Sequence, residues 1–168
     1  VWMDKFTIRN LELYNSNNAN AVTLIDVIDH TISPMGGRLL KRWLALPLKS
    51  LEKIKARHEV VQYFLDQEDT HHKIQNHIKQ VGDLERLISK VATAKVNPRE
   101  VVQLKNSLEA IVPIKALATN CKNADLKRIG EQIKSCEPLR EKIKAILNEE
   151  APVNILKGNS IASSASEE

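Results

Sequence analysis

Three histidines close together in this sequence, His71, His72 and His77, could do chemistry, because imidazole is a common zinc ligand. On a helix, two ligands must be three or four positions apart to lie on one face. Here the third histidine follows the other two by five and six positions. The spacing therefore turns the pair away from the third ring, and the sequence predicts no metal site.

The known catalytic motifs are also missing from the sequence. It has no G-x-x-x-x-G-K-[ST] phosphate loop, no H-E-x-x-H pair, and no Ser, His and Asp set in a recognisable motif. Gly36 and Gly37 have neither a preceding strand nor a following lysine, so they do not form a phosphate loop. We expect no catalytic and no cofactor-binding residue here, and the chain by itself should not be an enzyme.

The charged residues leave two interpretations open. Twenty-five Lys and Arg against 21 Asp and Glu give a net charge of +4 and permit an anionic partner. Phosphate contacts need several cations that converge, and two adjacent helices could supply them if they lie side by side. The candidates are Lys41, Arg42, Lys49, Lys53 and Arg57, together with Arg38. Because acidic residues are interleaved with them, the alternative is an ordinary solvated surface.

Composition bounds the class of protein. The 168 residues are 42% hydrophobic and 27% charged, which is typical of one folded domain, and few aromatic residues and glycines favour helices over a β-sandwich. Cys121 and Cys136 lack metal-ligand spacing and are expected to be free thiols, although a bridge between them stays open. Without a signal peptide or a long apolar run, we expect a cytoplasmic protein with no membrane contact.

The element best defined by its own residues is a helix that begins at Pro34. Ser33 is a good N-cap and proline suits the first helical position, while Pro47 disfavours helix at Leu46. Leucines and Trp43 recur on one side, which predicts that Trp43 is buried. Two glycines in the first turn, Gly36 and Gly37, cost helix stability, so either another backbone approaches there or the turn is frayed.

The remaining elements predict an all-α fold in a single domain, 1–168. Residues 1–22 should hold a short strand at 6–9 and a polar loop, and residues 23–150 a multi-helical core. The cap signals Thr23, Ser50, Asp83 and Asn97 mark helix starts, and Pro113 should kink or end a helix that begins at Pro98. Residues 151–168 lose periodicity and are expected to be an irregular, poorly ordered tail.

Several stretches of the sequence form specific motifs. The most specific is TISPMGGRLLKRWLALPL at 31–48. The others are Asp4, TIRNLEL at 7–13, LIDVIDHT at 24–31, RHEVV at 57–61, GDLERL at 82–87 and NEEAP at 148–152. Together they cover nearly the whole chain, and they resemble the MutS family of DNA mismatch repair proteins.

The resemblance implies the first part of the MutS core domain that carries the lever helices, a segment that links the DNA-reading and clamp domains to a distant ATPase domain. Mismatched duplex DNA, a second subunit, ATP and Mg²⁺ would belong to the longer parent, and the chain would stop short of the long lever helix. The expected structural and coupling residues are Pro34, Gly36, Gly37, Arg38, Trp43, Asp83 and Arg86. The alternative is an autonomous basic helical module that binds nucleic acid or protein, which salt-dependent DNA binding by the isolated chain would reveal.

Overall fold

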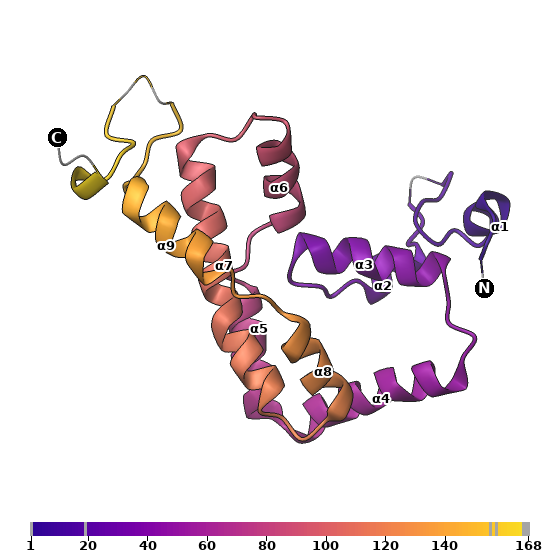
Figure 1. Ribbon diagram of the computed structural model, residues 1–168. Helices are drawn as coiled ribbons and strands as arrows, with labels where there is room; N and C mark the ends of the chain where they lie inside the picture. Colours follow the sequence, from indigo (N-terminus) through magenta and orange to yellow (C-terminus); the bar gives the residue numbers. More distant parts are fainter. Residues whose placement is uncertain (1, 19, 155, 157, 166–168) are drawn as a thin grey trace.

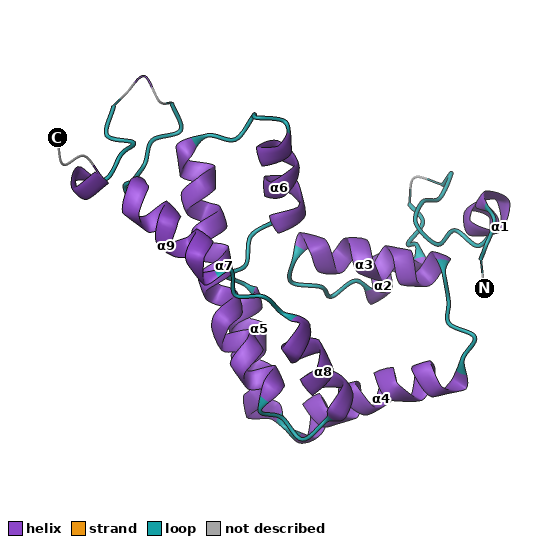
Figure 2. Cartoon of the chain, in the orientation of Figure 1, coloured by secondary structure: helices purple, strands orange, loops and turns teal. Residues whose placement is uncertain are grey.

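The computed structural model describes residues 2–18, 20–154, 156 and 158–165, and in this part of the chain every regular element is a helix (Figure 2). The elements are α1 (Lys5–Asn10), α2 (Leu24–Ile28), α3 (Pro34–Ala45), α4 (Leu51–Asp66), α5 (Glu68–Ile78), α6 (Leu84–Ala92), α7 (Pro98–Thr119), α8 (Ala124–Gln132), α9 (Glu137–Ile146) and the 3-10 helix η2 (Ser163–Ala165). The predicted all-α class is confirmed.

Polar caps place the helix starts where the sequence predicts them. The Ser33 hydroxyl accepts a hydrogen bond from the Gly36 amide at 3.1 Å, directly before Pro34 at the start of α3. Thr23 and Asn97 each form a reciprocal capping box with an acidic residue three positions later. Each cap satisfies amides that the helix leaves unpaired, so these boundaries follow from local chemistry.

The long helix α7 is the centre of the fold, and α5, α6, α8 and α9 pack around it (Figure 1). Leu104 and Leu108 of α7 meet Leu87 of α6 in a buried cluster. Pro113 lies inside α7 without ending it, so of the two expected outcomes the helix end is wrong, and a kink stays a prediction. The helices that pack along α7 supply tertiary contacts that oppose the local cost of proline.

The expected N-terminal strand is wrong, because residues 5–10 form the short helix α1. The Asp4 carboxylate accepts from the Thr7 amide at 2.9 Å and from its hydroxyl at 2.8 Å, which starts a helical turn. Phe6 is 76% exposed, and the described residues contain no strand with which it could pair. The N-cap at Asp4 therefore outweighs the strand preference of four alternating residues.

The C-terminal tail is irregular, as expected, but its described residues fold back on α9. Leu147 and Ile161 form an isolated antiparallel bridge, and the Ala162 amide donates to the Ile146 carbonyl at 2.9 Å. We call residues 147–162 the C-terminal hairpin. Residues 155, 157 and 166–168 lie outside the described residues, and poor order there stays a prediction.

The helix α3 lies at the periphery, away from the bundle around α7, whereas α4 runs back toward the bundle and contacts α5 and α8 there (Figure 1). Neither contains a buried residue, and Trp43 is 42% exposed. The prediction that Trp43 is buried is therefore wrong for this chain. The apolar stripe does exist, but helical spacing cannot say which element covers it. None of the helices in the described part combines the length and apolar composition that a transmembrane helix requires.

Candidate functional site

Arg38 joins the peripheral helix α3 to the start of α6. Its guanidinium donates to both carboxylate oxygens of Asp83, at 3.0 and 2.7 Å. Its Nε also donates to Glu85, at 2.7 Å. A planar guanidinium has the donors for two carboxylates at once, which lysine would not provide. These bonds connect residues more than forty positions apart in the sequence.

Asp83 both binds Arg38 and caps the helix α6. Its carboxylate is the N-cap of α6 and accepts from the Arg86 amide at 3.2 Å. The Arg38 guanidinium, together with this amide, lowers the pKa of Asp83 below its usual value of 3.8. The hydrogen bonds of Arg38 to Asp83 and, second, to Glu85 raise the pKa of its guanidinium above the usual value. Both partners therefore keep their charges at neutral pH.

Gly36 and Gly37 leave room for the turn that precedes α3. A Cβ on Gly36 would lie 3.0 Å from the Ser33 hydroxyl oxygen and 3.4 Å from Cβ of Thr31. One on Gly37 would lie 3.2 Å from the Thr31 hydroxyl oxygen. That hydroxyl donates to Asp29 at 2.6 Å, so the turn is closed by its own side chains. The glycines thus face the preceding turn of the same chain.

A second arginine attaches α3 to α4. The Cζ atom of Arg57 lies 3.5 Å from the centre of the Trp43 ring, a cation–π contact. Beside it runs an open, mainly apolar groove of about 680 Å³ between α3, α4 and α8. Trp43, Val60 and Ile129 contribute to its walls. Two arginine contacts, one at each end, thus hold α3.

The structure separates the six candidate phosphate-binding cations into two groups. Arg38 is engaged by two carboxylates and Arg57 covers Trp43. The other four are exposed: Lys41 and Arg42 on α3, Lys53 on α4, and Lys49 in the connection between them. Arg86 is exposed on α6, where its amide donates to Asp83. Two of the six candidates are thus already engaged within the chain.

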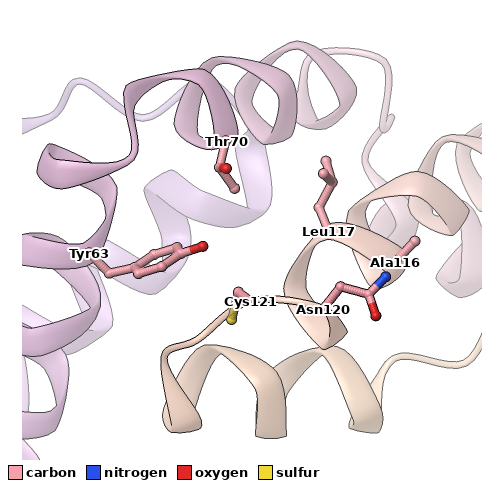
Figure 3. Close-up of a pocket in the computed structure, with 6 residues that line it drawn as sticks. All are labelled: Tyr63, Thr70, Ala116, Leu117, Asn120 and Cys121. Carbon is pink, nitrogen blue, oxygen red and sulfur yellow. The ribbon is translucent and has the colours of Figure 1, made fainter.

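A small pocket of about 230 Å³ lies where α4, α5 and the end of α7 meet (Figure 3). Its lining has no charged side chain and consists of Tyr63, Thr70, Ala116, Leu117, Asn120 and Cys121. Cys121 and Cys136 are both free thiols. Within the described residues, no three His, Cys, Asp or Glu side chains are grouped so that they could hold a metal ion.

Sequence reasoning did not select two residues that complete this site. Glu85 lies within the GDLERL motif, and its partner could be known only once α3 was placed in space. The Ser107 hydroxyl accepts a hydrogen bond from the Gly82 amide at 3.0 Å, and the residue is 1% exposed. A serine among the apolar residues of a long helix is a signal, because serine is not favoured in helix interiors.

Comparison with known families matches residues 6–168 to the family described as MutS domain III. The chain belongs to this family. It is similar to the DNA mismatch repair protein MutS of Flavobacterium psychrophilum, with 64% identity over 162 residues, 96% of this chain and 19% of that protein. The same-named protein of Flavobacterium johnsoniae is 63% identical over 168 residues, all of this chain and 19% of that protein. That of Bacteroides thetaiotaomicron is 49% identical over the same length, 20% of that protein.

The resemblance inferred from the sequence motifs is therefore confirmed. The chain spans about a fifth of the length of the curated relatives it matches. Within this domain III, the TISPMGGRLLKRWLALPL and GDLERL motifs, at 31–48 and 82–87, meet in space through Arg38, Asp83 and Glu85. Two of the motifs that carried the resemblance are thus the two sides of one contact.

Proposed function

We propose that this chain is the domain III segment of a MutS-type DNA mismatch repair protein, in which it acts as a structural and coupling element. The relatives' name supports the repair function, since the chain matches a fifth of their length from end to end. The observation that carries the coupling role is the attachment of α3. Charged and cation–π contacts hold it, while the bundle around α7 is held by an apolar core.

This difference in attachment matters for transmission. An apolar core is close-packed and resists small displacements, so the α7 bundle should move as one body. Exposed ion pairs contribute little stability and can rearrange, so α3 can change its position relative to the bundle at low cost. A segment with one rigid and one adjustable part can report a change at one end of a protein to the other.

The rest of the repair activity belongs to the longer protein in this proposal. Mismatched duplex DNA, a second subunit, ATP and Mg²⁺ would be bound by other domains, and the protein would work in the cytoplasm. The chain itself should neither bind nor hydrolyse ATP, in keeping with a sequence that has no phosphate loop. Calorimetric titration of the chain with Mg·ATP tests this, and saturable binding would contradict it.

The alternative of an autonomous DNA-binding module has less support. Two of its six candidate phosphate contacts, Arg38 and Arg57, are occupied by Asp83, Glu85 and Trp43. We therefore expect weak binding of the isolated chain to duplex DNA at physiological salt. Tight binding with a steep salt dependence would favour the alternative.

Arg38→Met in the full-length protein tests the coupling role, because it removes the bridge and keeps an aliphatic side chain. ATPase rate should be measured with and without mismatched DNA, and mismatch binding with and without ATP. We expect each effect to shrink, by about 0.5–2 kcal/mol of coupling free energy. Arg42→Met on the same helix is the matched control. Full-size effects in both variants would show that α3 is scaffold only.

A further inference from the structure

The turn that carries Asp83 is tied to α7 by a buried hydroxyl. The Gly82 amide donates to Oγ of Ser107 at 3.0 Å, and the Ser107 hydroxyl donates to the Gln103 carbonyl at 2.8 Å. Ser107 is 1% exposed, so water does not compete for these bonds. The hydroxyl thus connects the backbone of α7 with the backbone of the turn before α6.

The absence of a side chain at Gly82 lets the turn approach α7 closely. A Cβ at this position would lie 3.1 Å from Oγ of Ser107 and 3.3 Å from the Gln103 side-chain nitrogen. A larger residue would therefore push the turn away from α7. Asp83 follows directly, so the distance between this turn and α7 also sets the place of the Asp83 carboxylate. The chain of contacts runs from α7 through Ser107, Gly82 and Asp83 to Arg38.

We propose that Ser107 is a positioning residue, which holds the Gly82 turn against α7 and thereby presents the Asp83 carboxylate to Arg38. The inference rests on the proposed function for its consequence in the longer protein, and the contact itself is testable in this chain. The hydrogen bonds of Ser107 are to Gly82 and Gln103. Its effect on α3 runs through the turn, which connects the central helix to the adjustable one.

Ser107→Ala is the direct test, since it removes one oxygen and keeps the helix. It leaves the Gly82 amide without its partner, and we expect that amide to exchange with solvent roughly tenfold faster. The pKa of Asp83 should also rise toward 3.8, because its approach to Arg38 loosens while Glu85 and Arg86 stay nearby. Hydrogen exchange and NMR titration of the carboxyl groups measure the two effects.

Ser89→Ala is a closely matched control. The Ser89 hydroxyl donates to the carbonyl four residues earlier at 2.8 Å, as that of Ser107 does, but it lies on the exposed surface of α6. A general weakening of helices by Ser→Ala would move both variants alike. If Ser107→Ala leaves the Gly82 exchange rate and the Asp83 pKa at the values of Ser89→Ala, the positioning role is overturned.

Two further variants keep the test decisive. Gly82→Ala disturbs the same contact from the side of the turn and leaves α7 unchanged, so it should raise the pKa of Asp83 even if Ser107→Ala folds poorly. In the background of Arg38→Met, Ser107→Ala should have much less effect on the Asp83 pKa, because both act on one interaction. Fully additive effects would overturn the proposal.

The full-length protein separates this inference from the proposed function. If Ser107→Ala raises the Asp83 pKa and also weakens the reciprocal effects of ATP and mismatched DNA, both stand. If it raises the pKa and those effects keep their full size, Ser107 positions Asp83 but the coupling role of α3 is wrong. If the pKa does not move, the positioning role fails, and Arg38→Met alone decides the coupling role.

Discussion

Arg57 lies over the indole ring of Trp43, with its Cζ atom 3.5 Å from the ring centre. Trp43 is 42% exposed even with the arginine over its ring, so the helices in the described part of the chain do not bury it. Because Trp43 belongs to α3 and Arg57 to α4, the pair orients α3 against α4. This contact takes the place of the apolar core that the spacing of α3 predicts.

Arg57→Met tests this contact, since methionine keeps an apolar stem over the ring and removes the charge. We expect the free energy of unfolding to fall by about 0.5–1 kcal/mol, the usual size of an exposed cation–π pair. Trp43 fluorescence should change as well, measured in a Trp2→Phe background so that it is the one emitter. Arg42→Met in that background is the control, and equal changes in both variants would show that the contact contributes nothing.

Asp83→Asn separates the ion pair from the helix cap. Asparagine is a good N-cap, so α6 should keep its start while the charge that holds Arg38 is lost. The pKa of Asp83 is lowered in the folded chain, so its contribution to stability is complete above the unfolded value near 3.8. That contribution disappears as the pH falls through the lowered value.

The acid part of the stability profile, below about pH 4, should therefore be flatter for Asp83→Asn than for the parent chain. Urea unfolding at a series of pH values measures it, together with the salt dependence of the α3 amide exchange. Asp4→Asn is matched, because Asp4 is also an N-cap with a lowered pKa but its carboxylate is bound by Thr7 instead of Arg38. It should flatten the profile without changing α3. The reverse pattern would contradict the role of Asp83.

Gly130→Ala should destabilise the packing of α8 on α7. A Cβ on Gly130 would lie 2.8 Å from the Thr119 amide nitrogen and 2.9 Å from Cβ of Ala118, and neither atom can move alone. Overpacking should outweigh the better helix propensity of alanine and lower the free energy of unfolding by about 1–2 kcal/mol. Glu131→Ala on the exposed side should change it by about 0.5 kcal/mol or less. Increased stability of Gly130→Ala would contradict the close approach.

Local chemistry made much of the fold predictable. Ser33, Thr23, Asp83 and Asn97 cap the helices that the sequence predicts, because a cap and its helix lie within four residues of each other. The predicted strand at 6–9 was wrong because a local cap favours a helix there. Its alternation was weaker than the cap supplied by Asp4, which lies just before it.

The candidate site was predictable only in part. Arg38 and Asp83 were chosen from motifs, but their contact spans 45 positions, and no local pattern encodes it. The exposure of Trp43 had the same cause, since burial depends on the element that covers a stripe as well as on its spacing. Ser107 was not predicted, because helix periodicity identifies buried positions by their apolar side chains and gives no sign that a hydroxyl is buried.

The C-terminal hairpin depends on a buried lysine. The Lys105 side chain is 3% exposed in α7, and its Nζ lies 2.5 Å from a carboxylate oxygen of Glu149, at the beginning of the hairpin. A charge buried this deeply needs a partner, and the nearer carboxylate is the stronger one. Glu109 on α7 itself lies at 3.8 Å. Glu149 should therefore tie the hairpin to α7.

Glu149→Ala tests this tie. It should loosen the hairpin by about 1 kcal/mol, a modest value because Glu149 is 64% exposed, and speed exchange of the Asn148 and Ala162 amides roughly fivefold. These amides donate to the Ser160 and Ile146 carbonyls, so they report the closure of the hairpin. Glu109→Ala also removes a carboxylate from Lys105 but should leave both exchange rates nearly unchanged. If the two variants speed exchange equally, Lys105 needs only negative charge nearby, and the specific tie through Glu149 is wrong.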